Sequence, residues 1–173
     1  SAYDFNLRPL GTAQDSRGTA GTGQYQQKMT SRDSPPVLLC IGGHDPSGGA
    51  GIQADAEAAR AAGAHATSVI TCLTTQDTCG VRRILPQPAE QVDEQCRLLL
   101  DDSPVAAIKV GLLGSSRIAH TIASIVAEYP HIPLVLDPVL TSGAGESLTD
   151  AALLNQLRKH LLGHCTLITP NVP

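Results

Sequence analysis

The loop over residues 43–51, Gly-His-Asp-Pro-Ser-Gly-Gly-Ala-Gly, has the residue types best suited to hold a ligand. It follows an apolar run and precedes an Ala- and Glu-rich segment that is typical of a helix. Glycines let a backbone turn tightly and approach a ligand closely. A helix N-terminus adds N–H groups that bind polar or anionic ligands. The loop therefore indicates a site for a small molecule.

Acidic and amide side chains near the ends of apolar runs are further candidate contacts: Asp45, Asp55, Gln76, Asp77 and Asp137. An Asp beside Pro is usually a turn former, and this is the favoured interpretation of Asp45. Asp55, expected in a first helical turn, could serve only the helix dipole. Asp137 directly follows a buried run, where ligands are usually bound. The Gln76 amide can donate and accept hydrogen bonds together, which suits a heterocyclic base.

The remaining polar residues and the cysteines are not predicted to take part in catalysis or metal binding. Lys109 lies within an apolar run and therefore needs a partner or water. The histidines outside the glycine-rich loop are expected at the surface or at helix ends. The cysteines are odd in number and lack Cys-x-x-Cys spacing, which predicts reduced cytoplasmic thiols and no structural zinc.

These residues must be positioned by alternating apolar runs and helical patterns. Strands are expected over 37–42, 66–74, 106–110, 134–136 and 165–169, with a short extended piece at 81–85. Helices are expected over 52–62, from 88 to about 100, from Ser115 or Ser116 onward, and from Thr149 or Asp150 to about 161. The alternation predicts a mainly parallel sheet, with ligands bound beyond the carboxyl ends of its strands.

Length and composition limit the possible classes. The 173 residues suffice for one domain, or for one domain and a tail. A net charge of −4 without a basic run argues against nucleic acid or an anionic membrane as partner. No apolar run approaches the ~20 residues of a membrane span. Residues 1–36 are polar and aperiodic and are predicted to be a disordered leader or tail, with Met29 as a possible true start.

A dinucleotide-binding fingerprint is another interpretation of the same loop. Gly49-x-Gly51-x-x-Ala54 loosely matches a dinucleotide-binding pattern. That pattern needs an acidic residue at the end of the second strand, where Gln76 and then Asp77 stand, and neither fits convincingly. A Walker-type loop needs a lysine, and the segment has none. A nicotinamide-dinucleotide-binding domain therefore remains a minor alternative.

The segment 43–55 resembles the opening signature of the bifunctional hydroxymethylpyrimidine/phosphomethylpyrimidine kinases of thiamine biosynthesis. Further segments resemble this family in the same order, at 69–78, 108–113, 135–140 and 168–171. The resemblance runs from about residue 37 to residue 173. It implies a three-layer αβα ribokinase-like sandwich, incomplete at its C-terminal side, of which residues 37–173 are the N-terminal part.

The resemblance also implies an activity and a site. The activity is phosphorylation of 4-amino-5-hydroxymethyl-2-methylpyrimidine and its monophosphate with ATP and Mg²⁺, by a cytoplasmic enzyme that is a possible homodimer. Gln76 would hydrogen-bond the aminopyrimidine. The other pocket residues implied are Asp55, Ala50, Gly43, Thr74, Leu112 and Val139, with Asp137 and Asn171 toward the phosphates and Mg²⁺.

Some features depart from the family pattern. His44 stands where Ser or Thr is commoner, and Gly-Ala-Gly at 143–145 replaces a usual Lys-Ser-Gly. The family's loop with the catalytic Cys or Asp would fall beyond residue 173. The expectation is therefore a fragment that holds the pyrimidine side and is inactive or incomplete. Pyridoxal kinase and a catalytically dead pyrimidine-binding domain are the alternatives.

Overall fold

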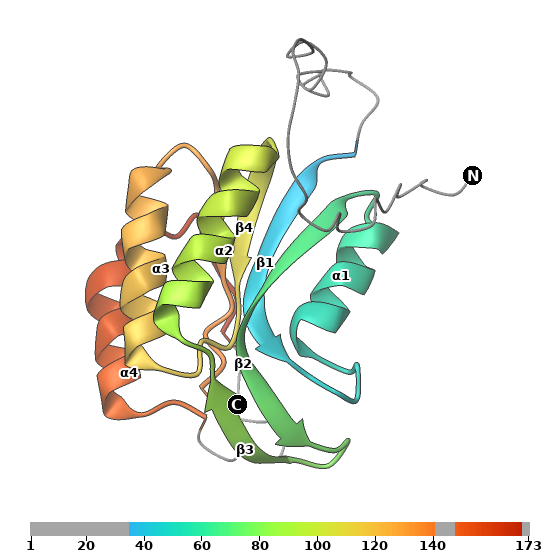
Figure 1. Ribbon diagram of the computed structural model, residues 1–173, viewed down its shortest axis with the longest axis vertical. Helices are drawn as coiled ribbons and strands as arrows, with labels where there is room; N and C mark the ends of the chain where they lie inside the picture. Colours follow the sequence, from blue (N-terminus) through green and yellow to red (C-terminus); the bar gives the residue numbers. More distant parts are fainter. Residues whose placement is uncertain (1–34, 141–147, 171–173) are drawn as a thin grey trace, which may run out of the picture. The chain divides into compact units, whose positions relative to one another are not determined.

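A six-stranded sheet in the order β3-β2-β1-β4-β5-β6 is the centre of the structure, a computed structural model that describes residues 35–140 and 148–170 (Figure 1). The parallel strands are β1 (Val37–His44), β2 (His65–Gln76), β4 (Val105–Val110), β5 (Leu134–Leu136) and β6 (Leu167–Ile168), and β3 (Val81–Pro86) runs antiparallel to β2. Predictions that concern residues 1–34, the loop 143–145 and Asn171 lie outside the described residues.

Helices cover both faces of this sheet. They are α1 (Gly51–Ala61), α2 (Ala89–Asp102), α3 (Ser116–Glu128) and α4 (Ala151–Gln156). In Figure 1, α1 lies on one face, whereas α2, α3 and α4 lie on the other. The predicted α/β class with a three-layer arrangement and a mainly parallel sheet is confirmed.

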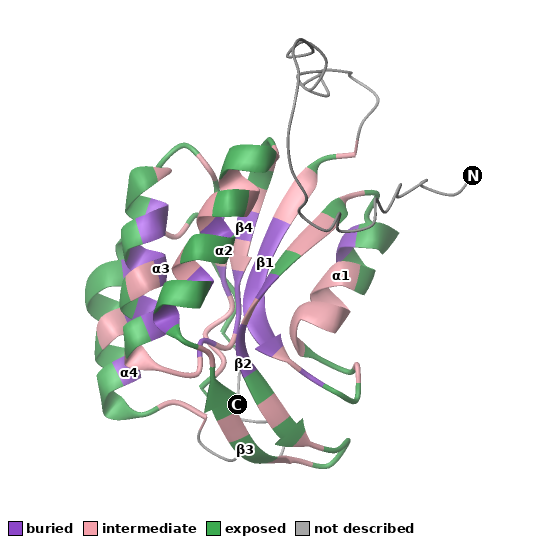
Figure 2. Ribbon diagram, viewed as in Figure 1, coloured by how far each residue is buried: buried purple, intermediate pink, exposed green. Residues whose placement is uncertain are grey.

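The core lies between the sheet and α3. The predicted apolar stripe of α3, formed by Ile118, Ile122, Ile125 and Val126, is buried. It packs in one cluster with buried residues of β1, β4 and β5 (Figure 2). This helix begins after Ser115, whose Oγ accepts a hydrogen bond from the Ile118 N–H at 3.2 Å, as expected of an N-cap.

The second strand is longer than the sequence predicts. The sequence predicts that this strand ends at residue 74. In the structure β2 continues to Gln76, because its last residues pair with β3. The extended piece 81–85 is thereby an antiparallel edge strand. Gln76 is placed on a strand, which fixes its direction more firmly than a turn would.

The last predicted helix and strand also differ. The α-helix ends at Gln156 and continues as a π-helical turn, Leu157–Leu161. Leu153, Leu157 and Leu161 are all buried at spacings of four residues, and the wider turn compensates for the drift that 3.6 residues per turn would cause. The strand predicted over 165–169 narrows to β6, whose Leu167 and Ile168 are exposed at the sheet edge.

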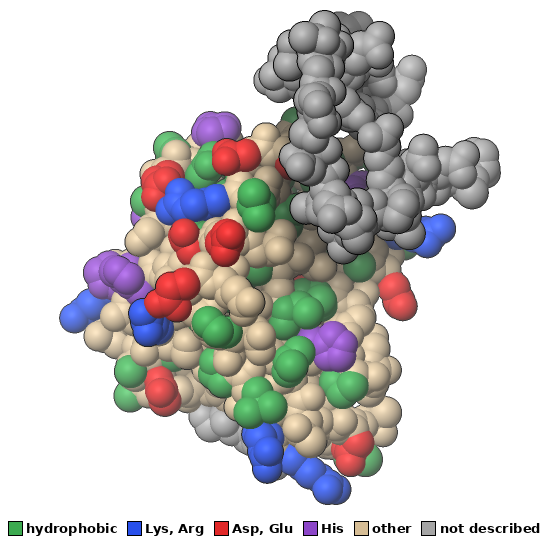
Figure 3. Space-filling model, in the orientation of Figure 1, with side chains coloured by type: hydrophobic (Ala, Val, Ile, Leu, Met, Phe, Trp, Pro, Cys, Tyr) green, Lys and Arg blue, Asp and Glu red, His purple; other side chains and the backbone are tan. Residues whose placement is uncertain are grey.

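The surface of the described chain carries charges of both signs, and its cysteines are unpaired. Acidic and basic side chains are interspersed on the face seen in Figure 3. None of the described helices is long and apolar enough to cross a membrane. All cysteines fall within the described ranges and are free thiols, and Cys40, Cys72 and Cys96 are buried.

Candidate active site

Asp45 organises the loop between β1 and α1. Its side chain is buried, and Oδ1 accepts hydrogen bonds from the N–H of Ser47 at 2.8 Å and from its hydroxyl at 2.7 Å. Oδ2 accepts from the N–H of Ala50 at 2.8 Å, and the N–H of Asp45 donates to Oε1 of Gln53 at 3.2 Å. The turn-forming interpretation of Asp45 therefore agrees with the structure.

The same carboxylate connects this loop to the end of β2. Burial alone would raise the pKa of Asp45, but hydrogen bonds from Ser47, Gln76 and Ala50 outweigh it and lower the pKa below its ordinary value. Gln76 thus lies beside the glycine-rich loop, near the Asp45 carboxylate. This contact could not be read from the sequence, in which the two residues are far apart.

We expect Asp45→Asn to destabilise the fold by roughly 1–3 kcal/mol at pH 7, because a buried charge-assisted acceptor is lost. The lowered pKa makes this contribution fully present above the ordinary value of 3.8 and lost as the pH falls through the folded-state pKa. Urea unfolding at pH 7 and pH 3 should therefore show a smaller difference between wild type and variant at pH 3. Asp101→Asn, at an exposed position, is the control; a difference for Asp45→Asn that does not shrink at pH 3 contradicts this role.

Two glycines allow the loop to lie close to the strand ends. Gly51 has φ +62°, and a Cβ there would overlap the carbonyl oxygen of Gly43. A Cβ on Gly43 would lie 3.1 Å from Sγ of Cys72 and 3.2 Å from Cδ2 of Leu112. The backbones of β1 and α1 therefore meet next to β2 and the segment after β4, with no room for a side chain.

Five of the predicted pyrimidine-side residues lie at this corner: Gly43, Ala50, Thr74, Gln76 and Leu112. The Thr74 hydroxyl donates to the carbonyl oxygen of His44 at 2.9 Å. Thr74 and Gln76 are half-buried whereas Thr75 is exposed, so Thr74 and Gln76 face the same side of β2. With Gly43, Ala50 and Leu112 they lie near the carboxyl ends of β1, β2 and β4, and this edge of a parallel sheet is where ligands usually bind.

A second cluster lies at the carboxyl ends of β4 and β5. Nζ of Lys109 is 2.8 Å from Oδ1 and 2.9 Å from Oδ2 of Asp55, and 3.8 Å from Oδ2 of Asp137. The partner that the sequence required for Lys109 is thus a pair of carboxylates. Asp55 lies beyond the first turn of α1, so the interpretation that it serves only the helix dipole is wrong. Nearby, burial and then the charge of Asp55 raise the pKa of Cys40 to about 11, which keeps this thiol protonated.

Val139 and Asn171 are the two predicted site residues that are not part of either cluster as described. Val139 follows β5, where its N–H donates to the carbonyl oxygen of Asp137 at 2.9 Å and its own carbonyl accepts from the Thr149 hydroxyl at 3.0 Å. Asn171 lies outside the described residues. The structure therefore places Val139 next to Asp137 without a described contact to Gln76.

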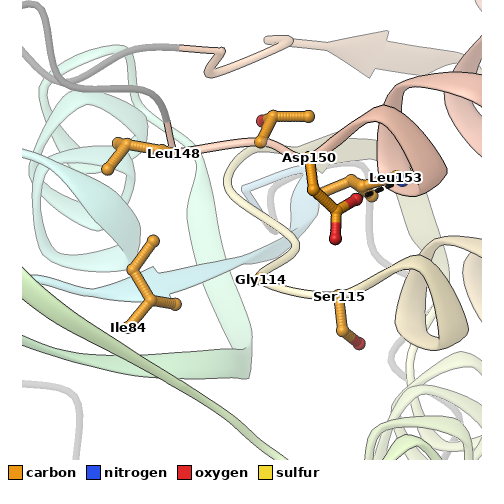
Figure 4. A pocket seen from close by; sticks show the side chains of 7 residues that line it. Ile84, Gly114, Ser115, Leu148, Asp150 and Leu153 are labelled. Atoms are coloured by element: carbon orange, nitrogen blue, oxygen red, sulfur yellow. Dashed lines mark hydrogen bonds between the residues drawn. The ribbon is translucent and has the colours of Figure 1, made fainter.

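An open cavity of about 420 Å³ lies beside this corner (Figure 4). It is lined by Ile84, Gly114, Ser115, Leu148, Thr149, Asp150 and Leu153. None of the predicted site residues in the described part of the chain lines it, although Ile84 is paired with Thr74 across the hairpin. The Asp150 carboxylate in this cavity is engaged as the cap of α4, accepting from the Leu153 N–H at 2.7 Å.

Known structures define the class of protein first. The chain matches a crystal structure of phosphomethylpyrimidine kinase from Clostridium difficile with a TM-score of 0.73 and 36% identity, over 80% of this chain and 60% of that one. It also matches an ADP complex of Bacillus subtilis pyridoxal kinase with a TM-score of 0.69 and 27% identity, over 80% of this chain and 51% of that one. The fold is that of the ribokinase-like small-molecule kinases.

The family follows from the sequence. Residues 45–173 match the phosphomethylpyrimidine kinase family, and the chain belongs to it. The hydroxymethylpyrimidine/phosphomethylpyrimidine kinase of Streptomyces coelicolor is 40% identical over 139 residues, which cover 80% of this chain and 51% of the relative. The chain thus spans about half the length of such relatives. The predicted family is confirmed.

Proposed function

We propose that this chain forms the pyrimidine-binding side of an ATP-dependent kinase that phosphorylates 4-amino-5-hydroxymethyl-2-methylpyrimidine and its monophosphate in thiamine biosynthesis. The observation that supports it best is the meeting of Gly43, Thr74, Leu112 and Gln76 at one corner of the sheet in a member of this family. In this proposal these positions would present apolar surface to one side of a small planar ligand and an amide to the other.

In this proposal each side chain has a limited task. Gln76 hydrogen-bonds the aminopyrimidine, and the Asp45 carboxylate lies near its amide. Asp55 accepts a hydrogen bond from a polar substituent of the ring, with both of its oxygens kept in place by Lys109. Gly43 and Gly51 let the backbone close against the ring and exclude water.

Among the described residues proposed to face the phosphates, Asp137 could bind a divalent cation. Mg²⁺ usually binds through one or two carboxylates together with substrate phosphates, and Asp137, 32% exposed at its side chain, suits this role. Mg²⁺ would neutralise phosphate charge during transfer from ATP. Solved pyridoxal kinases of this fold have been crystallised with ADP and AMP-PCP, which supports ATP as the phosphate donor here. Asn171 and the catalytic group that the family resemblance implies beyond residue 173 remain predictions, as do the cytoplasmic location and the homodimer.

Pyridoxal is the competing substrate, because pyridoxal kinases share the fold at TM-scores near those of the pyrimidine kinase. Calorimetric titration of the chain with hydroxymethylpyrimidine and with pyridoxal separates the two. We expect the pyrimidine to bind at least tenfold more tightly. Tighter pyridoxal binding, or binding of neither compound, would contradict the proposal.

A further inference from the structure

Lys109 is a largely buried cation whose ammonium contacts the Asp55 carboxylate. Its side chain is 19% exposed, and that of Asp55 is 18% exposed. The ammonium lies within hydrogen-bond distance of both oxygens of Asp55 and within ion-pair distance of Asp137. One positive charge therefore serves two carboxylates, which come from different elements, α1 and the end of β5.

The residues around Lys109 confine its ammonium to one position. Its neighbours on β4, Ile108 and Val110, are buried in the core on the side of α2 and α3, so Lys109 points to the opposite face, toward α1. A Cβ on Gly111 would lie 3.0 Å from Nζ of Lys109. The absence of a side chain at Gly111 thus makes space for the ammonium next to the carboxyl end of β4.

A purely structural role explains this arrangement poorly. Buried ion pairs contribute little to stability relative to apolar residues of similar size, since desolvation offsets their attraction. The cluster also sets two carboxylates against one ammonium, and the side chain of the second, Asp137, is 32% exposed and thus open to a ligand. Its place at the strand ends, where ligands bind in parallel sheets, favours a role in the site.

We propose that Lys109 is a positioning residue that fixes the Asp55 carboxylate for the pyrimidine and couples it to Asp137 on the phosphate side. This inference rests on the proposed function. Holding both Asp55 oxygens leaves the carboxylate one orientation, so that its remaining lone pairs face the substrate. The weaker contact at 3.8 Å leaves Asp137 able to move toward phosphate or a cation.

The test combines binding and unfolding measurements on the full chain. The variants are Lys109→Met, Asp55→Asn, the double variant, and Gly111→Ala, which displaces the ammonium without removing its charge. Lys159→Met, at an exposed lysine, is the matched control. We expect Lys109→Met and Asp55→Asn each to weaken hydroxymethylpyrimidine binding at least tenfold, Gly111→Ala to weaken it about threefold, and Lys159→Met to change it less than twofold.

The double variant separates positioning from stability. Because it leaves neither partner of the pair charged, its urea midpoint should recover toward wild type, while its affinity stays as low as that of either single variant. Wild-type affinity in a folded Lys109→Met or in the double variant would overturn the inference and leave the proposed function intact. Additive losses in the double variant would also overturn it. Absence of binding in the wild type would overturn both proposals.

Discussion

Gln76→Ala is expected to lower the affinity for 4-amino-5-hydroxymethyl-2-methylpyrimidine by about 10- to 100-fold. The proposed contact is a hydrogen bond between the amide and the aminopyrimidine, and a ligand group left unpaired in a desolvated site costs ~1–3 kcal/mol. Gln76→Glu should be at least as weak, because it loses the donor and places a second carboxylate beside Asp45. Calorimetric titration measures both losses.

Gln87→Ala is the matched control for this prediction. Gln87 follows the same hairpin and is half-buried, and its side-chain amide donates a hydrogen bond to the carbonyl oxygen of Leu85 at 3.4 Å. Its replacement should change the affinity less than twofold. Equal losses in Gln76→Ala and Gln87→Ala would indicate a general effect on the hairpin and would remove the specific role of Gln76.

Gly51→Ala is expected to have the largest effect on the fold, a loss of roughly 2–5 kcal/mol in the free energy of unfolding. A positive φ costs a non-glycine residue about 1–3 kcal/mol, and overpacking adds a similar amount. Here φ is +62°, and the new Cβ would overlap the Gly43 carbonyl oxygen, which is backbone and cannot move aside. Urea unfolding with the linear extrapolation measures the loss.

Gly63→Ala separates the two contributions. Gly63 has φ +79°, and no atom of the described residues lies within 4 Å of where its Cβ would be, so only the conformational cost of about 1–2 kcal/mol is expected. A loss in Gly51→Ala no larger than that in Gly63→Ala would mean that the loop shifts without cost. The close approach of β1 and α1 would then not be needed for the fold.

Local patterns in the sequence predict the elements well. The stripe of α3 and its Ser115 cap follow from helical spacing and cap chemistry, both of which act within a few residues. Errors occur where distant partners decide. The extra length of β2 depends on pairing with β3, and the π turn after Gln156 depends on which leucines reach the core.

The sequence likewise predicts some features of the candidate site and misses others. The carboxyl ends of the strands predict where a ligand binds, and the family resemblance supplies the roles of Gln76 and Asp55. The sequence gives no pairing between Lys109 and its carboxylates, since Asp55, Lys109 and Asp137 meet only when α1 packs on the sheet. Asp45 likewise predicts a turn but not a contact with Gln76.

The position of the bound pyrimidine is the most direct test of the proposed site. An ¹H–¹⁵N spectrum of the labelled chain, recorded while hydroxymethylpyrimidine is added, reports it residue by residue. The proposed site predicts shifts of the Gln76 side-chain amide and of the backbone amides of Gly43, Ala50 and Leu112. Shifts confined to Ser115 and Leu153 in the neighbouring cavity, or no shifts at saturating pyrimidine, would contradict it.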